Sequence, residues 1–324
     1  FKNHSEGWGP DKVLDGVRLR GYHQYLRRIS LKDEEISFAT ARLRMTIIKQ
    51  FYYWCFHTER INELPRNMNS SLLQMRRPKH LRVNQESTIR IMTKHDIKLL
   101  FGAISVYRGK YPLGLLTLLA LNTGMNLGDI TSMTSSHITI SESYGTMKIN
   151  KARKKTSVMG EWMLWDITAE YLKAHIIKIY GSIKSFNSDK GYRYLFPKLD
   201  YQTGTILNHP MDYNEIDVDL IKPKVVKRFT AEPQLNRMFK NAAIDFSVKH
   251  LRKTSGSTFL YLSGHNEVLT QKFLGHRPKT IALRHYAEVA LDRLEEYTTG
   301  IETELGINEL YPQIRLEIQN YGSR

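Results

Sequence analysis

Four side chains that could act together on a phosphate group lie in one stretch of the chain. Lys249 and Arg252 are three residues apart, so they share one face if this stretch is helical. His276 follows a Leu-Gly pair, and Tyr286 comes ten residues after it. Two cations and an imidazole can stabilise the non-bridging oxygens of a phosphate, and a tyrosine hydroxyl can attack its phosphorus. The set therefore indicates phosphoryl transfer to Tyr286.

The same residues resemble the tyrosine recombinase (phage integrase) family, whose signature is His-x-x-Arg, then Leu-Gly-His, then a nucleophilic Tyr. Leu251-Arg252-Lys253-Thr254 matches the Leu-Arg-x-Thr core of that signature. The resemblance implies that Arg252 is the family's second catalytic arginine, that His276 is its histidine and that Tyr286 is its nucleophile. Lys249 stands where the family usually has His, as in some members and in type IB topoisomerases. The resemblance also implies a covalent 3′-phosphotyrosyl intermediate, with no cofactor and no metal, because the tyrosyl link conserves the phosphodiester energy.

The position of the family's first catalytic arginine departs from the pattern. The family reads Thr-Gly-Leu-Arg there, whereas this chain has Thr123-Gly124 followed by Met125 and Asn126. An amide can hydrogen-bond a phosphate oxygen but brings no charge. Another cation would then have to supply the charge. Lys249 and Arg153 are both candidates, and Lys249 is the first choice because it is longer and more fully charged than the family's His.

A basic run follows a predicted β-hairpin formed by 138–140 and 147–149 and leads to a third strand at 157–165. The run is Lys151-Ala152-Arg153-Lys154-Lys155-Thr156. In the family, a lysine on the turn between the second and third strands is the general acid for the leaving 5′ oxygen. The resemblance favours Lys155 for this role, with Lys154 as the second choice. We expect Lys151 to contact DNA.

The charge of the chain suits a polyanionic partner. The 324 residues carry a net charge of +16, and residues 1–90 carry 17 Lys and Arg against 9 Asp and Glu. The single cysteine, Cys55, excludes an intrachain disulfide. The longest apolar run, 113–121, is too short to span a bilayer, so no membrane partner is expected. The chain begins at Phe1 rather than Met, which is compatible with a longer protein.

The pattern of elements predicts a mostly α fold with a small antiparallel β-sheet (α+β), divided along the chain. We expect a helical core-binding (SAM-like) DNA-binding domain at 1–75, a basic linker at 76–92, a catalytic domain at 93–300 and a tail at 301–324. In the first domain a helix is indicated by an apolar stripe, with Thr40 as its cap and with Arg42 and Arg44 pointing away from the stripe toward DNA; the stripe consists of Leu43, Ile47, Phe51 and Trp54. The linker contributes further DNA-contacting cations, namely Arg76, Arg77, Lys79 and Arg82.

Several elements of the catalytic domain are also indicated. Thr93 and Asp96 form a capping-box pattern at the start of a helix, and the Leu-rich helix at 113–121 should be buried on all sides. Residues 200–222 are rich in turn residues and suggest a surface insertion. A helix after Tyr286, within 288–324, could dock on a neighbouring subunit or pack on its own core.

Three functional hypotheses remain open at this point. The first is a site-specific recombinase or integrase that mobilises a phage or a transposable element, acts on double-stranded DNA and self-associates on it as a dimer to tetramer synapse. The second is a type IB topoisomerase-like enzyme, which Lys249 fits. The third is a catalytically impaired DNA-binding relative, which Asn126 would explain. For a protein of a prokaryote or its phage, the first hypothesis implies a cytoplasmic, nucleoid-associated location.

Overall fold

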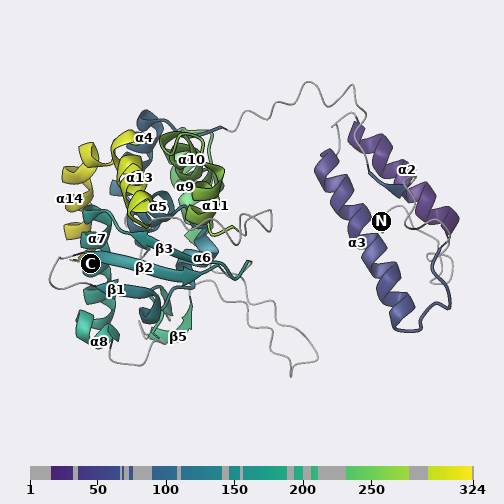
Figure 1. The fold of residues 1–324 in the computed structure, drawn as a ribbon, viewed down its shortest axis with the longest axis horizontal. Coiled ribbons are helices and arrows are strands. Elements are labelled where there is room, and N and C mark those ends of the chain that lie inside the picture. The colour runs from purple at the N-terminus through teal and green to yellow at the C-terminus, as the bar shows by residue number, and fades with distance from the viewer. Residues whose placement is uncertain are drawn as a thin grey trace. The chain divides into compact units, whose positions relative to one another are not determined.

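The computed structural model shows two compact units, Phe1–Thr88 and Ile89–Arg324 (Figure 1). It describes residues 16–31, 36–65, 68, 73–75, 90–107, 111–140, 146–153, 156–187, 193–199, 206–210, 231–276 and 291–322. These residues form helices and a small antiparallel sheet, so the predicted fold class is confirmed.

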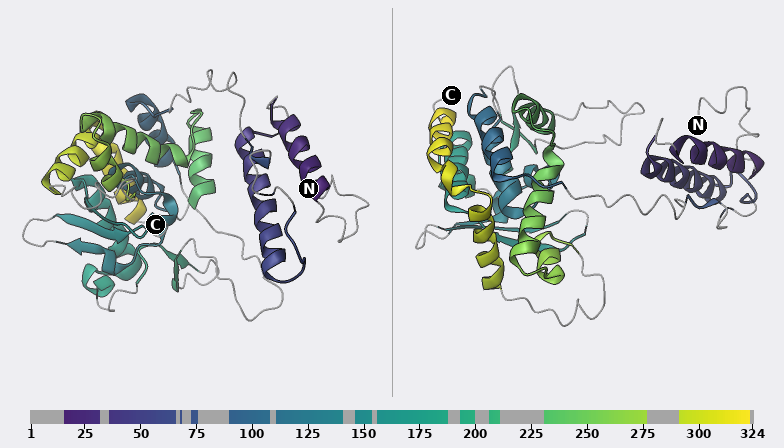
Figure 2. Two further views of the ribbon diagram at one scale, coloured as in Figure 1. Left: turned by 45° about the vertical axis from the view of Figure 1, so that its right-hand side comes forward. Right: turned by 90° about the horizontal axis from the view of Figure 1, so that it is seen from above.

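The first unit is built on two helices, α2 (Gly16–Leu31) and α3 (Phe38–His57), which lie side by side (Figure 2). The helix α3 begins at Ser37, whose hydroxyl accepts a hydrogen bond from the backbone N–H of Thr40, so the predicted cap at Thr40 was three residues late. The two helices bury one face each against the other; the buried side chains are Leu19, Tyr22, Leu26 and Ile29 on α2, and Ala41, Met45, Tyr52 and Cys55 on α3.

The predicted stripe of α3 lies on the wrong side of the helix. Leu43, Ile47, Phe51 and Trp54 are all exposed, Leu43 by 59%. Arg42 and Arg44 are exposed as expected. In a helix of 3.6 residues per turn, the centre of the buried set lies roughly 130° around the helix from the centre of the predicted stripe. The helix is apolar on both sides, so its periodicity alone could not identify the side that packs on α2.

The second unit contains the other helices and strands. In chain order they are α4 (Lys94–Ser105), α5 (Leu113–Thr123), α6 (Leu127–Thr131), β1 (Ile138–Ile140), β2 (Met147–Ala152), β3 (Met159–Met163), α7 (Asp166–Tyr180), α8 (Ile183–Asn187), β4 (Pro197–Leu199), β5 (Ile206–Pro210), α9 (Ala231–Asn241), α10 (Val248–Leu262), α11 (Glu267–Phe273), α13 (Leu291–Glu304) and α14 (Tyr311–Gly322). The predicted capping box at Thr93 and Asp96 is present.

The helix α5 forms the centre of this unit. Every residue from Leu113 to Thr123 is buried, which confirms the prediction for this helix. It packs against α4, α7, α9, α10 and α13. Each fully buried leucine contributes about 1.5–3 kcal/mol through removal of its apolar surface from water, so α5 is the main organiser of the core. Its end is fixed by Asn122, whose amide donates to Met163 O and accepts from Trp165 N.

The strands β1, β2 and β3 form an antiparallel sheet in that order, as predicted (Figure 1). The helices α11 and α13 pack against β3. A second, two-stranded sheet pairs β4 with β5. The strand β5 lies inside 200–222, a segment whose composition predicts turns only; most of that segment is outside the described residues.

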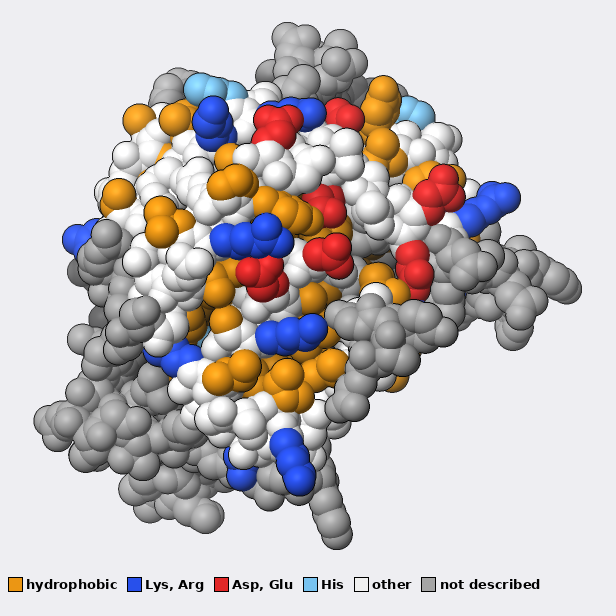
Figure 3. Space-filling view, turned by 90° about the vertical axis from the view of Figure 1, so that its left-hand side faces the viewer, with side chains coloured by type: hydrophobic (Ala, Val, Ile, Leu, Met, Phe, Trp, Pro, Cys, Tyr) orange, Lys and Arg blue, Asp and Glu red, His pale blue; other side chains and the backbone are white. Residues whose placement is uncertain are grey.

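The C-terminal residues belong to the second unit. The helix α14 packs on α7 and α4, and it buries Ile314, Ile318 and Tyr321. Of the two alternatives for this region, the structure therefore shows packing on its own core. The face that includes these elements carries acidic and basic side chains interspersed with small apolar patches (Figure 3). Among the described residues, no helix is both long enough and apolar enough to cross a membrane.

Candidate active site

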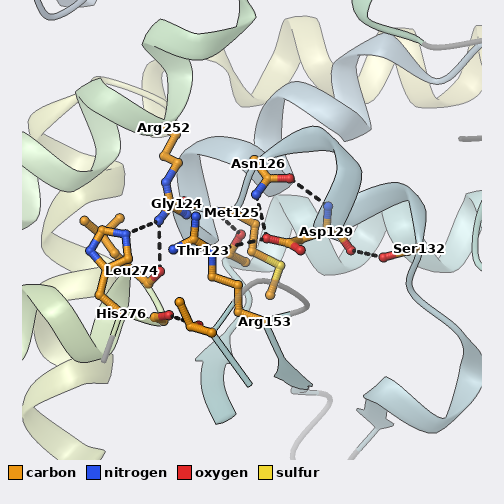
Figure 4. A network of polar contacts seen from close by, with 12 residues as sticks. Thr123, Gly124, Met125, Asn126, Asp129, Ser132, Arg153, Arg252, Leu274 and His276 are labelled. Atoms are coloured by element: carbon orange, nitrogen blue, oxygen red, sulfur yellow. Dashed lines mark hydrogen bonds and ion pairs between the residues drawn. The ribbon is translucent and has the colours of Figure 1, made fainter. Parts of the chain in front are cut away.

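The guanidinium of Arg252 is held by two backbone carbonyls from distant parts of the chain. It donates to Gly124 O, at the end of α5, and through Nη2 to Leu274 O at 2.9 Å, at the end of α11 (Figure 4). Gly124 is required at this place, because its φ is +61° and a Cβ there would approach Phe273 to 2.8 Å. The ends of α5 and α11 thus meet around one arginine from α10.

His276 completes this arrangement. Its Nε2 lies 3.0 Å from Arg252 Nη2. A guanidinium can only donate, so Nε2 is the acceptor and the ring is neutral, with its proton on Nδ1. The predicted association of Arg252 with His276 is therefore present in the geometry.

Asn126 does not project its amide as a substitute for an arginine. It is the N-cap of α6: Oδ1 accepts from Asp129 N at 2.9 Å, and Nδ2 donates to Asp129 Oδ2 at 2.6 Å. An Asn three residues before an Asp is a capping arrangement that satisfies the first turn of a helix. The Asp129 carboxylate is consequently held in place with its side chain only 10% exposed.

Arg153 reaches the same place from the end of β2. Its Nε lies 3.6 Å from Asp129 Oδ2, and its side chain is only 16% exposed. The backbone around it closes the turn before β3, because Arg153 N donates to Val158 O and Arg153 O accepts from Ser157 N. Thr156 on the same turn donates its hydroxyl to Gly275 O at 2.8 Å. Hence the β2–β3 turn is fastened directly to the residue before His276.

The described side chains of this cluster carry more positive than negative charge. The pKa of Arg252 is lowered to about 10, chiefly by burial and also by the positive charge of Arg153, while Asp129 acts in the opposite direction. Arg252 therefore remains charged at neutral pH. Two guanidinium groups share one buried carboxylate, and such an excess suits a bound anion.

The remaining predicted cations of this region occupy different surroundings. Lys249 is exposed on the first turn of α10. Lys151 is buried, and its ammonium donates to Ser132 O at 3.2 Å, while its contact with DNA stays a prediction. The backbone carbonyl offers this ammonium a partner that replaces water. His250 accepts a hydrogen bond from Ser247 N and caps α10. This capping role explains why a histidine stands one place after Lys249, the position where the family usually has His.

Several predicted site residues lie outside the described part of the chain. These are Tyr286, Lys154, Lys155, Arg76, Arg77, Lys79 and Arg82. Lys154 and Lys155 lie between Arg153 and Thr156 in the chain. Both of these neighbouring residues contact the cluster around Gly275. Within the described residues, no group of three or more His, Cys, Asp or Glu side chains is placed to hold a metal ion.

Sequence reasoning gave no role to Asp129 or to the carbonyls of Gly124 and Leu274. The Asn-x-x-Asp spacing at 126–129 was a usable signal for the cap and its carboxylate. The carbonyl contacts had no local signal, because they join residues that are 128 and 22 positions away from Arg252 in the chain.

Comparisons with known proteins found similar solved structures. XerH site-specific recombinase bound to its palindromic difH substrate is similar over 95% of this chain and 75% of that chain, with 17% identity and a TM-score of 0.50. The Tn1549 transposon integrase in complex with circular intermediate DNA covers 94% of this chain and 90% of its own, with 15% identity and a TM-score of 0.49. A comparison with curated proteins found no match. At these identities XerH shows a shared fold.

The family comparison goes further than the fold. The model of the phage integrase family matches residues 90–293, more than half of the chain. The match includes Asn126, Arg153, Arg252 and His276, which form the cluster described above. The chain therefore belongs to the phage integrase family of tyrosine recombinases, which break and rejoin DNA strands.

Proposed function

We propose that this chain is a site-specific DNA recombinase that cleaves and rejoins strands through a covalent 3′-phosphotyrosyl link at Tyr286, and that it mobilises a phage or transposable element. The observation that carries the proposal is the Arg252 guanidinium, fixed between Gly124 O and Leu274 O and beside the neutral imidazole of His276. Tyr286 follows His276 by ten residues. A preorganised donor set of this kind stabilises charge that develops during phosphoryl transfer.

The reaction assigns one task to each group. The hydroxyl oxygen of Tyr286 attacks phosphorus and forms the phosphotyrosyl bond. Arg252 Nη2 turns from His276 Nε2 to the phosphate, and the freed Nε2 accepts the phenolic proton. The P–O5′ bond breaks, and Lys155 donates a proton to the leaving 5′ oxygen. Arg252 donates to the non-bridging oxygens throughout. Lys155 is supported in this role by its flanks, because Arg153 and Thr156 both reach Gly275.

Double-stranded DNA is the proposed partner. The net charge of +16 and the concentration of cations in 1–90 support contacts with many phosphates. XerH, which shares the fold, is described as bound to its difH substrate. We propose self-association on DNA as well. The helices α13 and α14 pack on their own unit, so a contact between copies would use their outward faces or other surfaces.

A covalent-capture experiment tests the proposal and does not require a known target sequence. A pool of nicked duplexes with a randomised core is incubated with the protein, and DNA that stays attached under denaturing conditions is recovered and sequenced. We expect enriched sites with the wild type and none with Tyr286→Phe. Recovery of the same sites with Tyr286→Phe would show that another residue is the nucleophile.

The products separate the proposal from its alternatives. Joined strands from two different duplexes support a recombinase. Relaxation of supercoiled DNA with no joining of duplexes would instead support a type IB topoisomerase-like enzyme, which Lys249 in the position of the usual His would fit. DNA binding with no covalent product would support a DNA-binding relative without catalysis.

A further inference from the structure

The cluster around Arg252 contains a second buried arginine that the roles above do not use. Arg153 lies between Asp129 and the Arg252 side chain (Figure 4). Its Nε–H is 3.6 Å from the carboxylate and finds no hydrogen-bond acceptor among the described residues. Charge attraction to Asp129 therefore holds Arg153 in place, and its Nε–H makes no hydrogen bond to any of the described residues.

The backbone and the packing of Arg153 restrict where its guanidinium can go. Its own N–H and C=O close the β2–β3 turn. A Cβ built on Gly275 would lie 3.5 Å from the Cβ and the Cδ of Arg153, so the arginine stem runs along the glycine that precedes His276. A rigid backbone and a packed stem hold the charge beside Arg252 and His276. A buried donor without a partner destabilises a fold, so its retention points to a ligand.

The charge balance indicates what that ligand is. Two guanidinium groups face a single carboxylate, and Asp129 already accepts a hydrogen bond from Asn126. His276 is neutral in this arrangement, because its Nε2 accepts from Arg252. Among the described residues, the surplus is therefore one positive charge in a poorly hydrated place, which matches a singly charged phosphodiester.

Resting on the function proposed above, we propose that Arg153 supplies the second positive charge on the scissile phosphate, in place of the arginine that is missing at Asn126. Asn126 and Asp129 are then positioning residues: the amide fixes the carboxylate, and the carboxylate directs Arg153. The sequence favoured Lys249 for this charge and kept Arg153 as the second choice. Lys249 is exposed, and no ion pair in the described part of the chain fixes its ammonium, whereas Arg153 is already in the cluster.

The test compares cleavage of a charged and a neutral phosphate. One duplex, taken from the covalent-capture pool, carries an ordinary phosphodiester at the scissile position, and its twin carries a methylphosphonate, in which a methyl group replaces a charged oxygen. Single-turnover cleavage of both is measured for the wild type, Arg153→Met and a control, Arg315→Met. The control removes an exposed arginine that pairs with Glu170.

We expect Arg153→Met to slow cleavage of the phosphodiester by about 10²–10³, as for removal of one charge-stabilising donor, and to slow cleavage of the methylphosphonate by less than about tenfold. Efficient cleavage of the neutral substrate also shows that the variant is folded. Arg315→Met should match the wild type on both substrates. Adding Asn126→Arg to Arg153→Met should restore part of the lost rate on the phosphodiester, because it returns charge to the other side of Asp129.

Two outcomes overturn the assignment of Arg153. The first is wild-type cleavage of the phosphodiester by Arg153→Met. The second is an equal loss on both substrates, which would mean that the arginine only supports the turn. In both cases the wild type still forms its adduct, so the proposed function survives. If the wild type forms no adduct on any duplex, the proposed function fails and the role of Arg153 fails with it.

Discussion

Two buried polar clusters in the second unit differ in how completely the chain satisfies them. Around His175, Nε2 lies 2.9 Å from Leu195 O and Nδ1 lies 2.9 Å from Tyr321 Oη. A carbonyl can only accept, so Nε2 carries the proton, and the hydroxyl of Tyr321 donates to Nδ1. The ring is neutral and both of its nitrogens are bonded. Around Arg252, by contrast, two guanidinium groups share one carboxylate.

The contrast separates a cluster that stabilises from one that binds. The His175 cluster fixes α14 on α7 and has no capacity for a further ligand. The Arg252 cluster keeps a buried Nε–H of Arg153 without an acceptor among the described residues, and it bears surplus positive charge. Mutations in the first should therefore change stability, and mutations in the second should change chemistry.

The largest effect is expected for Arg252→Ala. Loss of its charge and donors should slow single-turnover cleavage by about 10²–10³. DNA affinity should fall much less, because many other cations of the chain are proposed to contact the DNA backbone. Cleavage rate and Kd are measured on the same captured duplex. An equal loss in rate and affinity would place Arg252 among ordinary binding residues and remove the contrast.

His175→Ala should have the opposite signature. Loss of the packed ring and of two hydrogen bonds should lower the free energy of unfolding by about 2–4 kcal/mol. At a temperature where the variant is folded, its cleavage rate should equal that of the wild type. Thermal unfolding and cleavage are compared with those of His95→Ala, which alters an exposed histidine of the same unit. A large rate defect in folded His175→Ala would contradict a purely stabilising role.

The His175 cluster should also make stability depend on pH. The pKa of His175 is lowered to about 4, chiefly by burial; its hydrogen bond to Leu195 O acts to raise the pKa, and the nearby Lys178 acts to lower it. Between that pKa and the ordinary value, the unfolded chain binds more protons, so stability is present above about pH 6.5 and is lost as the pH falls toward 4. From pH 7 to 5 the expected contribution is about 2 kcal/mol.

Thermal unfolding at each pH, for the wild type and for His175→Gln, isolates this contribution. The glutamine does not titrate, so the difference between the two proteins should shrink as the pH falls. A constant difference from pH 7 to 5 would mean that His175 does not contribute to the loss of stability in acid.

The smallest effect concerns anion binding by the cluster itself. Sulfate at several times its Kd should stabilise the wild type by about 1 kcal/mol through binding to the folded state. Sulfate also stabilises proteins generally, so the informative quantity is the difference from Arg252→Ala, measured by thermal unfolding. Equal stabilisation of both proteins would argue that the cluster binds no anion.

The sequence predicted most of the second unit because its local signals and its packing agree. The capping box at Thr93 and the all-apolar helix α5 are encoded by neighbouring residues alone. The hairpin of β1 and β2 followed from alternation. In the first unit the same reasoning was wrong for α3, because that helix has apolar side chains on both faces and only α2 determines which face is buried.

The residues of the site, like the elements of the fold, could be predicted only in part. Arg252 and His276 were identifiable by type and spacing, and the structure brings them within 3.0 Å. The place of Arg153 was not, because it depends on the fastening of the β2–β3 turn to Gly275 and on a carboxylate held by Asn126. The first contact joins residues that are distant in the chain, and the second resembles an ordinary helix cap.

The most direct test of the account is a structure of the Tyr286→Phe protein bound to its captured duplex. We predict that the non-bridging oxygens of one phosphate accept hydrogen bonds from both Arg252 and Arg153, at about 2.7–2.9 Å for charged pairs, with the substituted aromatic ring at position 286 facing that phosphorus. If the DNA passes the cluster without placing a phosphate between the two arginines, the surplus charge has another purpose and the account is contradicted.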